Sequence, residues 1–334
     1  MIYGITVLFS FLFLKLFSII KTPILSDIPN ERSMHSLPVK RSAGIVFFGL
    51  FWIIIIFLSS EKNVFNNDFF FIYSCTLFFS ILGFLDDIKN LSSKIKLILE
   101  IFFIFVVLLI YPSSYSILTF EMLNFNYINI FILTIYIVFI SNLCNFMDGL
   151  DLYLSITYLI FIINFTIFNN FIISDYLNFL IYLLFSMSSF YYFNSPNAKM
   201  FMGDSGSLPL GFLIGISPLY SNVESLPKDL SLIILFIPLF IIDGVFTLIR
   251  RIIGKKYIFS AHREHLYQRV QIELGWSKWR TLFVFTILNV VPCIFYFMLR
   301  EFGTGKLGII LSFFLLFFIY IRIFLQCEKL PRPG

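Results

Sequence analysis

Long apolar stretches separated by short polar segments make up nearly the whole chain. A helix needs about 20 mostly apolar residues to cross a bilayer, with a range of roughly 17–25. Stretches of this kind begin near residues 2, 44, 69, 97, 128, 152, 176, 206, 230, 281 and 305. The pattern predicts an all-α integral membrane protein with about eleven transmembrane helices, forming one polytopic domain over residues 1–334. The first stretch lacks a small-residue cleavage site, so we expect a retained span there.

The composition agrees with a membrane protein. Of the 334 residues 59% are hydrophobic and only 13% are charged, whereas soluble domains carry roughly 45–50% apolar and about 25% charged residues. Four cysteines lie far apart and form no metal-binding spacing; they are Cys75, Cys144, Cys293 and Cys327. We therefore expect them to fill apolar space.

The basic residues predict an orientation. With eleven spans, the connecting segments 21–43, 86–96, 142–151, 194–205 and 250–280 and the tail after residue 321 share one side. That side carries 19 of the 24 Lys and Arg residues, and the other side carries 4. Because positive charge marks the cytoplasmic side, we expect the N-terminus outside and the C-terminus in the cytoplasm.

Five polar motifs fall on the predicted cytoplasmic side. They read "DIPNERSMHSLPVKRSAG", "GFLDDIKNLSSKIKL", "NLCNFMDGLD", "FNSPNAKMFMGDSGS" and "AHREHLYQR". Ionisable groups near membrane depth are costly and commonly mark a functional site. Topology alone does not require the acids, since Asp and Glu contribute little to orientation. The pattern predicts an active site at the cytoplasmic face.

The second motif contains the adjacent acids Asp86 and Asp87 at the end of an apolar stretch. Two carboxylates this close raise each other's pKa unless a cation neutralises them. Mg²⁺ suits such a place, because it is bound through one or two carboxylates together with substrate phosphates. The alternative is a helix-terminal acidic pair that bridges to Lys89 or Lys94.

The third motif repeats a polar residue every three positions, at Asn142, Asn145, Asp148 and Asp151. Side chains three apart on a helix lie on adjoining faces, so we expect one wall of a cleft that meets a nucleotide base, a ribose or a metal. The alternative is a capping and turn segment that satisfies loose backbone.

The last two motifs also carry candidate chemistry. Asp204 lies between small residues just before an apolar stretch, where a ligand can approach the backbone closely. His262 and His265 flank Arg263 in a strongly basic segment. Two histidines with a carboxylate could bind zinc, but the surrounding basic residues favour phosphate, which Arg263 could bind through two hydrogen bonds.

In this order, the five motifs resemble those of the polyprenyl-phosphate N-acetylhexosamine-1-phosphate transferases. The resemblance covers nearly the whole chain, and its first and last motifs are most similar to the branch that initiates O-antigen synthesis. There are departures: Ala43–Gly44 replaces a frequent glycine pair, Glu100 a frequent glutamine and Leu152 a usual glycine. Leu152 adds bulk beside Asp151 and is expected to alter the nucleotide site.

The resemblance implies roles for the motif residues. The implied Mg²⁺ ligands, with Mn²⁺ as an alternative ion, are Asp87, Asn145 and Asp204. Asp86 or Asp87 resembles the base that acts on the lipid phosphate. The same resemblance implies further positions. Lys96 resembles the lysine that follows the acidic pair, and Asn142 is expected to bind substrate. Asp148 and Asp151, with Phe201 stacking, resemble the uridine site, and His262, Arg263 and His265 resemble contacts to the diphosphate or sugar.

The implied enzyme transfers an N-acetylhexosamine 1-phosphate from a UDP-sugar to undecaprenyl phosphate in a bacterial inner membrane, releasing UMP and starting an O-antigen-like glycan. The expected partners are the UDP-sugar, the polyprenyl phosphate and the bilayer, without nucleic acid, and a homodimer stays open. The alternatives are a phospho-MurNAc-pentapeptide transferase of peptidoglycan synthesis and, in another class, a multi-span transporter. Transporters place charges near the midplane and often contain repeats, which this sequence lacks.

Overall fold

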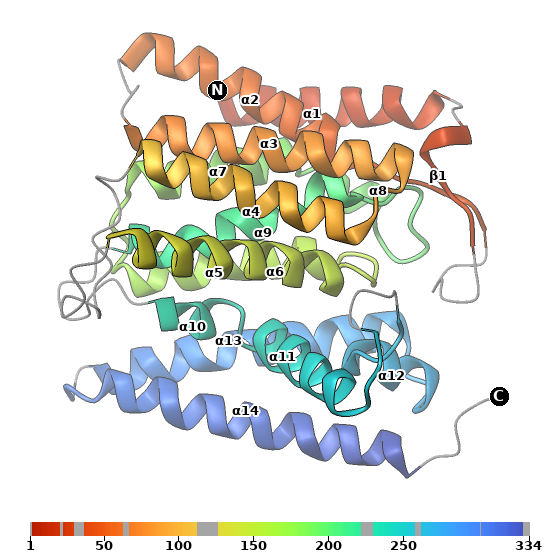
Figure 1. The fold of residues 1–334 in the computed structure, drawn as a ribbon, viewed down its shortest axis with the longest axis vertical. Coiled ribbons are helices and arrows are strands. Elements are labelled where there is room, and N and C mark those ends of the chain that lie inside the picture. The colour runs from red at the N-terminus through yellow and green to blue at the C-terminus, as the bar shows by residue number, and fades with distance from the viewer. Residues whose placement is uncertain are drawn as a thin grey trace.

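The computed structural model describes residues 2–20, 23–29, 37–62, 67–111, 126–221, 230–257, 262–300 and 302–329. These residues are mostly helical (Figure 1). The elements are α1 (Ile2–Ile19), η1 (Pro23–Leu25), β1 (Ser26–Asp27), β2 (Val39–Lys40), α2 (Ala43–Lys62), α3 (Asn67–Lys89), α4 (Ser93–Ile110), α5 (Asn126–Met147), α6 (Tyr153–Phe168), α7 (Asp175–Ser186), α8 (Phe190–Phe193), α9 (Asp204–Ile216), η3 (Ser217–Tyr220), η4 (Leu230–Leu232), α10 (Ile233–Phe236), α11 (Pro238–Ile253), α12 (Leu266–Ile272), α13 (Lys278–Arg300) and α14 (Gly305–Glu328).

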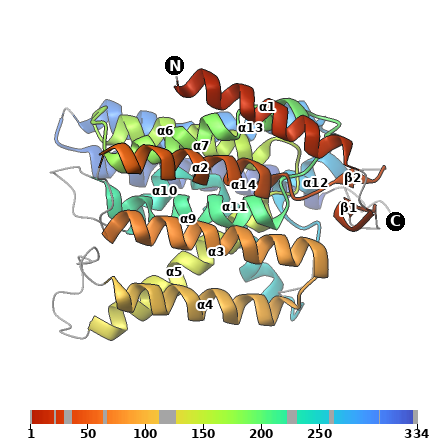
Figure 2. The ribbon, with the colours of Figure 1, turned by 90° about the horizontal axis from the view of Figure 1, so that it is seen from above.

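The long helices lie alongside one another, and successive ones run in opposite directions (Figure 1). As a result β1, α8, α12 and the end of α14 lie together at the right-hand end of Figure 1. Figure 2 shows β1, β2 and α12 at this same end from another side. The segments that precede α2, α4, α6 and α9 also meet there, so the polar motifs of the sequence gather at one end of the bundle.

The predicted spans coincide with helices, because each of the eleven expected starting points falls in or near the beginning of a described helical segment. Within the part of the chain that the structure describes, five helices are long and apolar enough to cross a membrane: Ile2–Ile19, Phe70–Lys89, Tyr127–Met147, Lys278–Arg300 and Leu307–Glu328. These helices indicate a multi-pass membrane protein. The count of eleven spans and the orientation stay predictions.

A small strand pair departs from the purely helical prediction. β1 and β2 pair antiparallel, with Ser26 opposite Lys40 and Asp27 opposite Val39. Lys40 also forms a bridge to Met200 just before α9. Two residues per strand are too few for a pattern of alternating polarity, so the sequence carries no strand signal here.

Helix α9 occupies the centre of the bundle. It packs mainly against α3 and α5, and also against α2, and all its residues from Ser205 to Ile216 are buried. Glycines permit this approach. A Cβ atom added to Gly83 of α3 would lie 2.3 Å from the carbonyl carbon of Asp204, and one added to Gly44 of α2 would lie 2.1 Å from the amide nitrogen of Gly206.

We therefore expect Gly44→Ala to destabilise the protein although alanine favours helices. Extra atoms in a packed interior cost about 1–3 kcal/mol, which outweighs the gain of roughly 1 kcal/mol in helix propensity. Gly49→Ala in the same helix is the matched control, because nothing lies within 4 Å of its added Cβ. Thermal unfolding in detergent should show a lower midpoint for Gly44→Ala and an equal or higher one for Gly49→Ala. Equal midpoints for both variants would contradict the close contact.

Candidate active site

Polar side chains from three helices meet at the first residue of α9. The Lys96 ammonium of α4 lies 3.0 Å from Asp86 Oδ2 of α3 and 2.6 Å from Asp204 Oδ2 at the start of α9. Its side chain is 12% exposed, so solvent reaches the group only in part. One lysine thus compensates two carboxylates that the chain separates by more than a hundred residues.

Asn145 brings α5 to the same place. Its Nδ2 donates to Asp204 Oδ2 at 3.0 Å, and its Oδ1 accepts from the Ser207 hydroxyl at 3.2 Å. Ser207 lies one turn into α9 and also donates to the Gly203 carbonyl. These contacts fix the side chain orientation of Asp204 from the side opposite the acidic pair. We call Asp86, Asp87, Lys96, Asn145 and Asp204 the acidic cluster.

Asp87 holds the backbone at the start of α9. Its Oδ1 accepts from the Asp204 amide at 3.1 Å, and its Oδ2 accepts from the Ser42 hydroxyl at 2.7 Å and the Ser205 amide at 3.4 Å. Gly203 has φ of 70°, and a Cβ there would lie 2.4 Å from Asp87 Oδ2. The carboxylate therefore caps α9 closely. Arg41 donates to the Asp87 carbonyl as well.

The acidic pair thus divides into two environments, as expected when adjacent helical side chains diverge by about 100°. Asp87 is buried and faces protein donors, whereas the Asp86 side chain is 16% exposed. Asp86 Oδ1 accepts from the Leu91 amide at 2.7 Å. This leaves Asp86 as the member of the pair that a ligand can reach.

Asn142 is held one turn behind Asn145. Its Nδ2 donates to Glu100 Oε2 and, at 3.0 Å, to the Val138 carbonyl. Glu100 is fully buried in α4, one turn beyond Lys96. Sequence analysis identified Glu100 only as a replacement for a frequent glutamine. In the structure its carboxylate orients Asn142, one of the predicted substrate-binding residues.

Asp148 lies in the turn after α5. Burial raises its pKa, and the nearby charges of Asp204, Asp151 and Asp87 raise it further. This places Asp148 beside the acidic cluster. Gly149 follows it, and a Cβ there would lie 2.3 Å from the Tyr267 hydroxyl, so the turn packs against the last motif.

Asp151 contacts a different set of groups. Its Oδ2 accepts from Lys278 Nζ at 2.7 Å and from the Asn197 amide at 3.1 Å. It therefore joins the start of α13 to the segment before α9. Leu152 adopts φ of 63°, the left-handed region that favours glycine, and its side chain is buried in the hydrophobic core. The side chain packs into the core, and the expectation that this leucine alters the nucleotide site stays a prediction.

Phe201 lies at the junction of two motifs. Its amide donates to the Lys40 carbonyl at 2.7 Å, and its carbonyl accepts from the Ala43 amide at 3.1 Å. The first motif is therefore joined to the fourth through the backbone. Residues 30–36 of the first motif lie outside the described residues.

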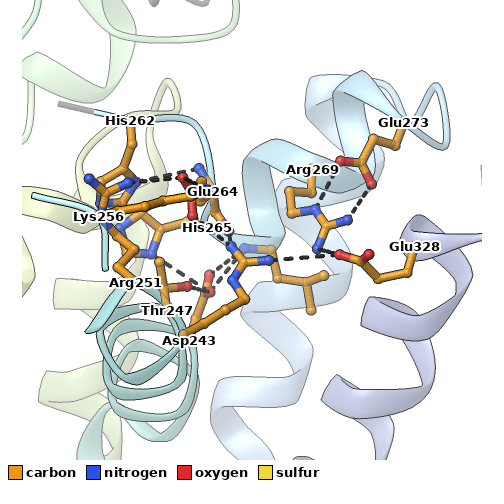
Figure 3. A network of polar contacts seen from close by, with 12 residues as sticks. Asp243, Thr247, Arg251, Lys256, His262, Glu264, His265, Arg269, Glu273 and Glu328 are labelled. Atoms are coloured by element: carbon orange, nitrogen blue, oxygen red, sulfur yellow. Dashed lines mark hydrogen bonds and ion pairs between the residues drawn. The ribbon is translucent and has the colours of Figure 1, made fainter. Parts of the chain in front are cut away.

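The last motif forms a loop that we call the His loop, residues 262–266 (Figure 3). The rings of His262 and His265 are 4.9 Å apart. Burial lowers the pKa of His262 to about 4, and the charges of His265 and Arg251 act in the same direction. The His262 imidazole is therefore neutral at pH 7. Arg263 lies between the two histidines and is half-buried.

The basic residues near the His loop are partly neutralised by one carboxylate. Glu264 lies 2.9 Å from Arg251, 2.9 Å from Lys256 and 3.3 Å from Arg250. Burial alone would raise the Glu264 pKa, but the hydrogen bond from Lys256 and the charges of the three cations lower it. The sequence predicted a phosphate-binding surface from the cations and did not identify this internal partner.

The acidic cluster has donors that fit Mg²⁺. Among the described residues no group of three or more His, Cys, Asp and Glu side chains could hold a metal ion. Magnesium sites commonly use one or two carboxylates and complete their coordination with phosphates and water. Asp204 and the Asn145 amide oxygen offer such ligands. Asp87, the third predicted ligand, already accepts from Ser42 and from the start of α9.

Comparison with known proteins agrees with the geometry. Residues 69–222 match the model of glycosyl transferase family 4. This segment contains the second, third and fourth motifs, and thus every residue of the acidic cluster. This match supports the family that the five motifs predicted.

Family members of known name align over most of the chain. An undecaprenyl-phosphate alpha-N-acetylglucosaminyl 1-phosphate transferase of Thermotoga maritima is 29% identical, over 79% of this chain and 78% of the relative. A probable undecaprenyl-phosphate N-acetylglucosaminyl 1-phosphate transferase of Bacillus subtilis is 27% identical, over 88% and 82%. A phospho-N-acetylmuramoyl-pentapeptide-transferase of Wolbachia sp. subsp. Drosophila simulans is 28% identical, over 66% and 73%.

Proposed function

We propose that the protein transfers an N-acetylhexosamine 1-phosphate from a UDP-sugar to undecaprenyl phosphate at the cytoplasmic face of a bacterial inner membrane. UMP is released, and the product starts an O-antigen-like surface glycan. The observation that carries the proposal is the convergence of Asp86, Lys96, Asn145 and Asp204 at one end of an apolar bundle. The names of the Thermotoga and Bacillus relatives support the same reaction.

The location suits both substrates. A sugar nucleotide is water-soluble, whereas the isoprenoid chain of the acceptor lies in the bilayer. A site at the end of the helices lets the lipid phosphate meet the nucleotide while the tail stays among apolar side chains. This also distinguishes the enzyme from the transporter alternative, in which charged groups lie near the midplane.

In the proposed reaction, a lipid phosphate oxygen attacks the sugar-linked phosphorus. The bond between that phosphorus and the bridging oxygen breaks, and the oxygen leaves with UMP. Asp86 is partly exposed and its orientation is fixed, so it is the member of the acidic pair placed to accept a proton from the lipid phosphate. Asp87 acts indirectly, by fixing the backbone of Asp204.

Bound Mg²⁺, or Mn²⁺ in its place, would polarise the diphosphate and neutralise its charge, held by Asp204 and Asn145. Lys96 adds a fixed positive charge beside Asp204 that favours an anionic substrate. Arg263 and the two histidines of the His loop are proposed to contact the diphosphate or the sugar. Such fixed charges contribute most when they need no rearrangement during the reaction.

The Wolbachia relative favours a second candidate, phospho-MurNAc-pentapeptide transfer. Similar enzymes commonly carry several histidines in succession. Here Arg263 and Glu264 separate His262 from His265, which supports the hexosamine branch.

The test is UMP release by the purified full-length protein in detergent. Undecaprenyl phosphate and Mg²⁺ are supplied with UDP-GlcNAc, with its 6-deoxy or 4-amino relatives, or with UDP-MurNAc-pentapeptide. We expect lipid-dependent release with one of the hexosamine nucleotides and none after chelation of the metal. Release with the pentapeptide nucleotide alone would establish the second candidate, and no release with any donor would overturn both.

A further inference from the structure

A fully buried carboxylate lies beneath the His loop. Asp243 of α11 is 0% exposed. Its oxygens accept from the Thr247 hydroxyl at 3.2 Å (Figure 3). They also accept from the Leu266 amide at 2.9 and 3.0 Å and from the Tyr320 hydroxyl at 3.0 Å. Asp243 thus joins α11, α14 and the first residue of α12. It is not part of any of the five motifs.

Asp243 also faces one nitrogen of His265. The distance from His265 Nδ1 to Asp243 Oδ1 is 3.7 Å. His265 is 4% exposed, and its Nδ1 is buried without a hydrogen-bond partner among the described residues. The Asp243 carboxylate therefore lies beside a buried ring nitrogen that forms no hydrogen bond within the described part of the chain.

A carboxylate 3.7 Å from a ring nitrogen is too far for a full hydrogen bond, but its charge favours a proton on that nitrogen. A neutral imidazole has one N–H donor and one acceptor nitrogen, and the partner of one nitrogen fixes the role of the other. An ionised carboxylate accepts and does not donate. With Asp243 at Nδ1, the proton stays on Nδ1 and Nε2 remains as the nitrogen that can act at the site.

The His loop is connected to the acidic cluster. The ring of His265 stacks on Tyr267 with centroids 5.9 Å apart, and the Tyr267 hydroxyl donates to the Phe146 carbonyl at 3.4 Å. Phe146 lies two residues before Asp148. The position of the His265 ring is therefore fixed, through Tyr267, relative to the turn after α5 that contains Asp148.

We propose that Asp243 is a positioning residue that holds the proton of His265 on Nδ1 and so presents Nε2 to the substrate. The consequence for turnover rests on the proposed transferase function. The tautomer does not, because it is a property of the protein without substrate. An aspartate behind a catalytic histidine acts in this way in other enzymes, where replacement by asparagine stabilises the wrong tautomer.

The experiment uses the full-length protein in detergent with ¹³C- and ¹⁵N-labelled histidine. The chain has only three histidines, so the variants His35→Gln and His262→Gln assign the His265 signals. At a pH where the ring is neutral, we expect the Nδ1–H tautomer in the unmodified protein. Finding the Nε2–H tautomer there would overturn the proposal, whether or not Asp243→Asn folds.

Variants separate this role from a purely structural one. Asp243→Asn should shift His265 to the Nε2–H tautomer and lower kcat about 10–100-fold with little change in KM. Tyr320→Phe and Thr247→Val each remove another partner of Asp243 and should leave the tautomer unchanged. An unchanged tautomer in Asp243→Asn, or an equal shift in all three variants, would contradict the assignment. Absence of UMP release from every protein would refute the proposed function and leave the tautomer result standing.

Discussion

Asp204→Asn is expected to reduce UMP release by at least about 10²–10³-fold, the range seen when one fixed transition-state contact is removed. Asparagine has the same shape, so the contact with Asn145 can be retained in part. It lacks the charge that pairs with Lys96 and that would bind the metal. The measurement is kcat with saturating UDP-sugar and lipid, over a range of Mg²⁺ concentrations.

Asp175→Asn is the matched control for this variant. Asp175 is exposed in the first turn of α7 and belongs to none of the five motifs. It should retain full activity. Thermal unfolding distinguishes loss of chemistry from loss of fold, because Asp204→Asn should keep a midpoint near that of the unmodified protein. Undiminished turnover in Asp204→Asn would remove this residue from the mechanism.

The helices could be predicted because a helix that crosses a membrane requires a run of apolar residues of matching length. The central position of α9 in the bundle could not be predicted. Its apolar run is short and contains Pro209, and nothing in hydropathy shows which helix the others surround. The deciding features are Gly44 and Gly83, which act through close contact with a distant backbone.

The residues of the acidic cluster could be predicted from the motifs, but their contacts with one another could not. The polar repeat of the third motif was expected to line one wall. On a helix, however, a step of three residues turns the side chain by roughly 60° backwards. Asn145 accordingly meets Asp204, Asn142 meets Glu100, and Asp151, beyond the helix end, meets Lys278. The spacing of these residues indicated that they lie near one another. Their hydrogen-bond partners depend on how the other helices pack around them, which the sequence does not show.

The basic segment before α13 shows the same limit. Its cations suggested a phosphate-binding surface, but Arg251 and Lys256 share Glu264, and Arg269 pairs with Glu273 at 2.8 Å and Glu328 at 2.9 Å. Counting charges gives their sum and not their pairing. Glu328 is the clearest case, because it reaches this segment from the end of the last helix.

Lys96→Met is expected to lower kcat by about 10²-fold or more, since the electrostatic contribution of a fixed cation is lost. Methionine keeps an unbranched chain of similar length but removes the charge between Asp86 and Asp204. The two carboxylates then repel each other without compensation. We therefore expect a lower unfolding midpoint in the absence of divalent ions, and its recovery when Mg²⁺ is added.

Although Lys96→Met should lower kcat, it should strengthen the binding of Mg²⁺. An ammonium 2.6 Å from Asp204 repels a second cation at the same carboxylate, so its removal should lower the Mg²⁺ concentration that gives half-maximal stabilisation. Lys94→Met in the same helix is the control, because Lys94 is exposed and its loss should leave both readouts unchanged. If Lys96→Met instead needed more Mg²⁺ than the unmodified protein, Lys96 would have to support the metal site rather than compete with it, and the proposed charge balance of the acidic cluster would be wrong.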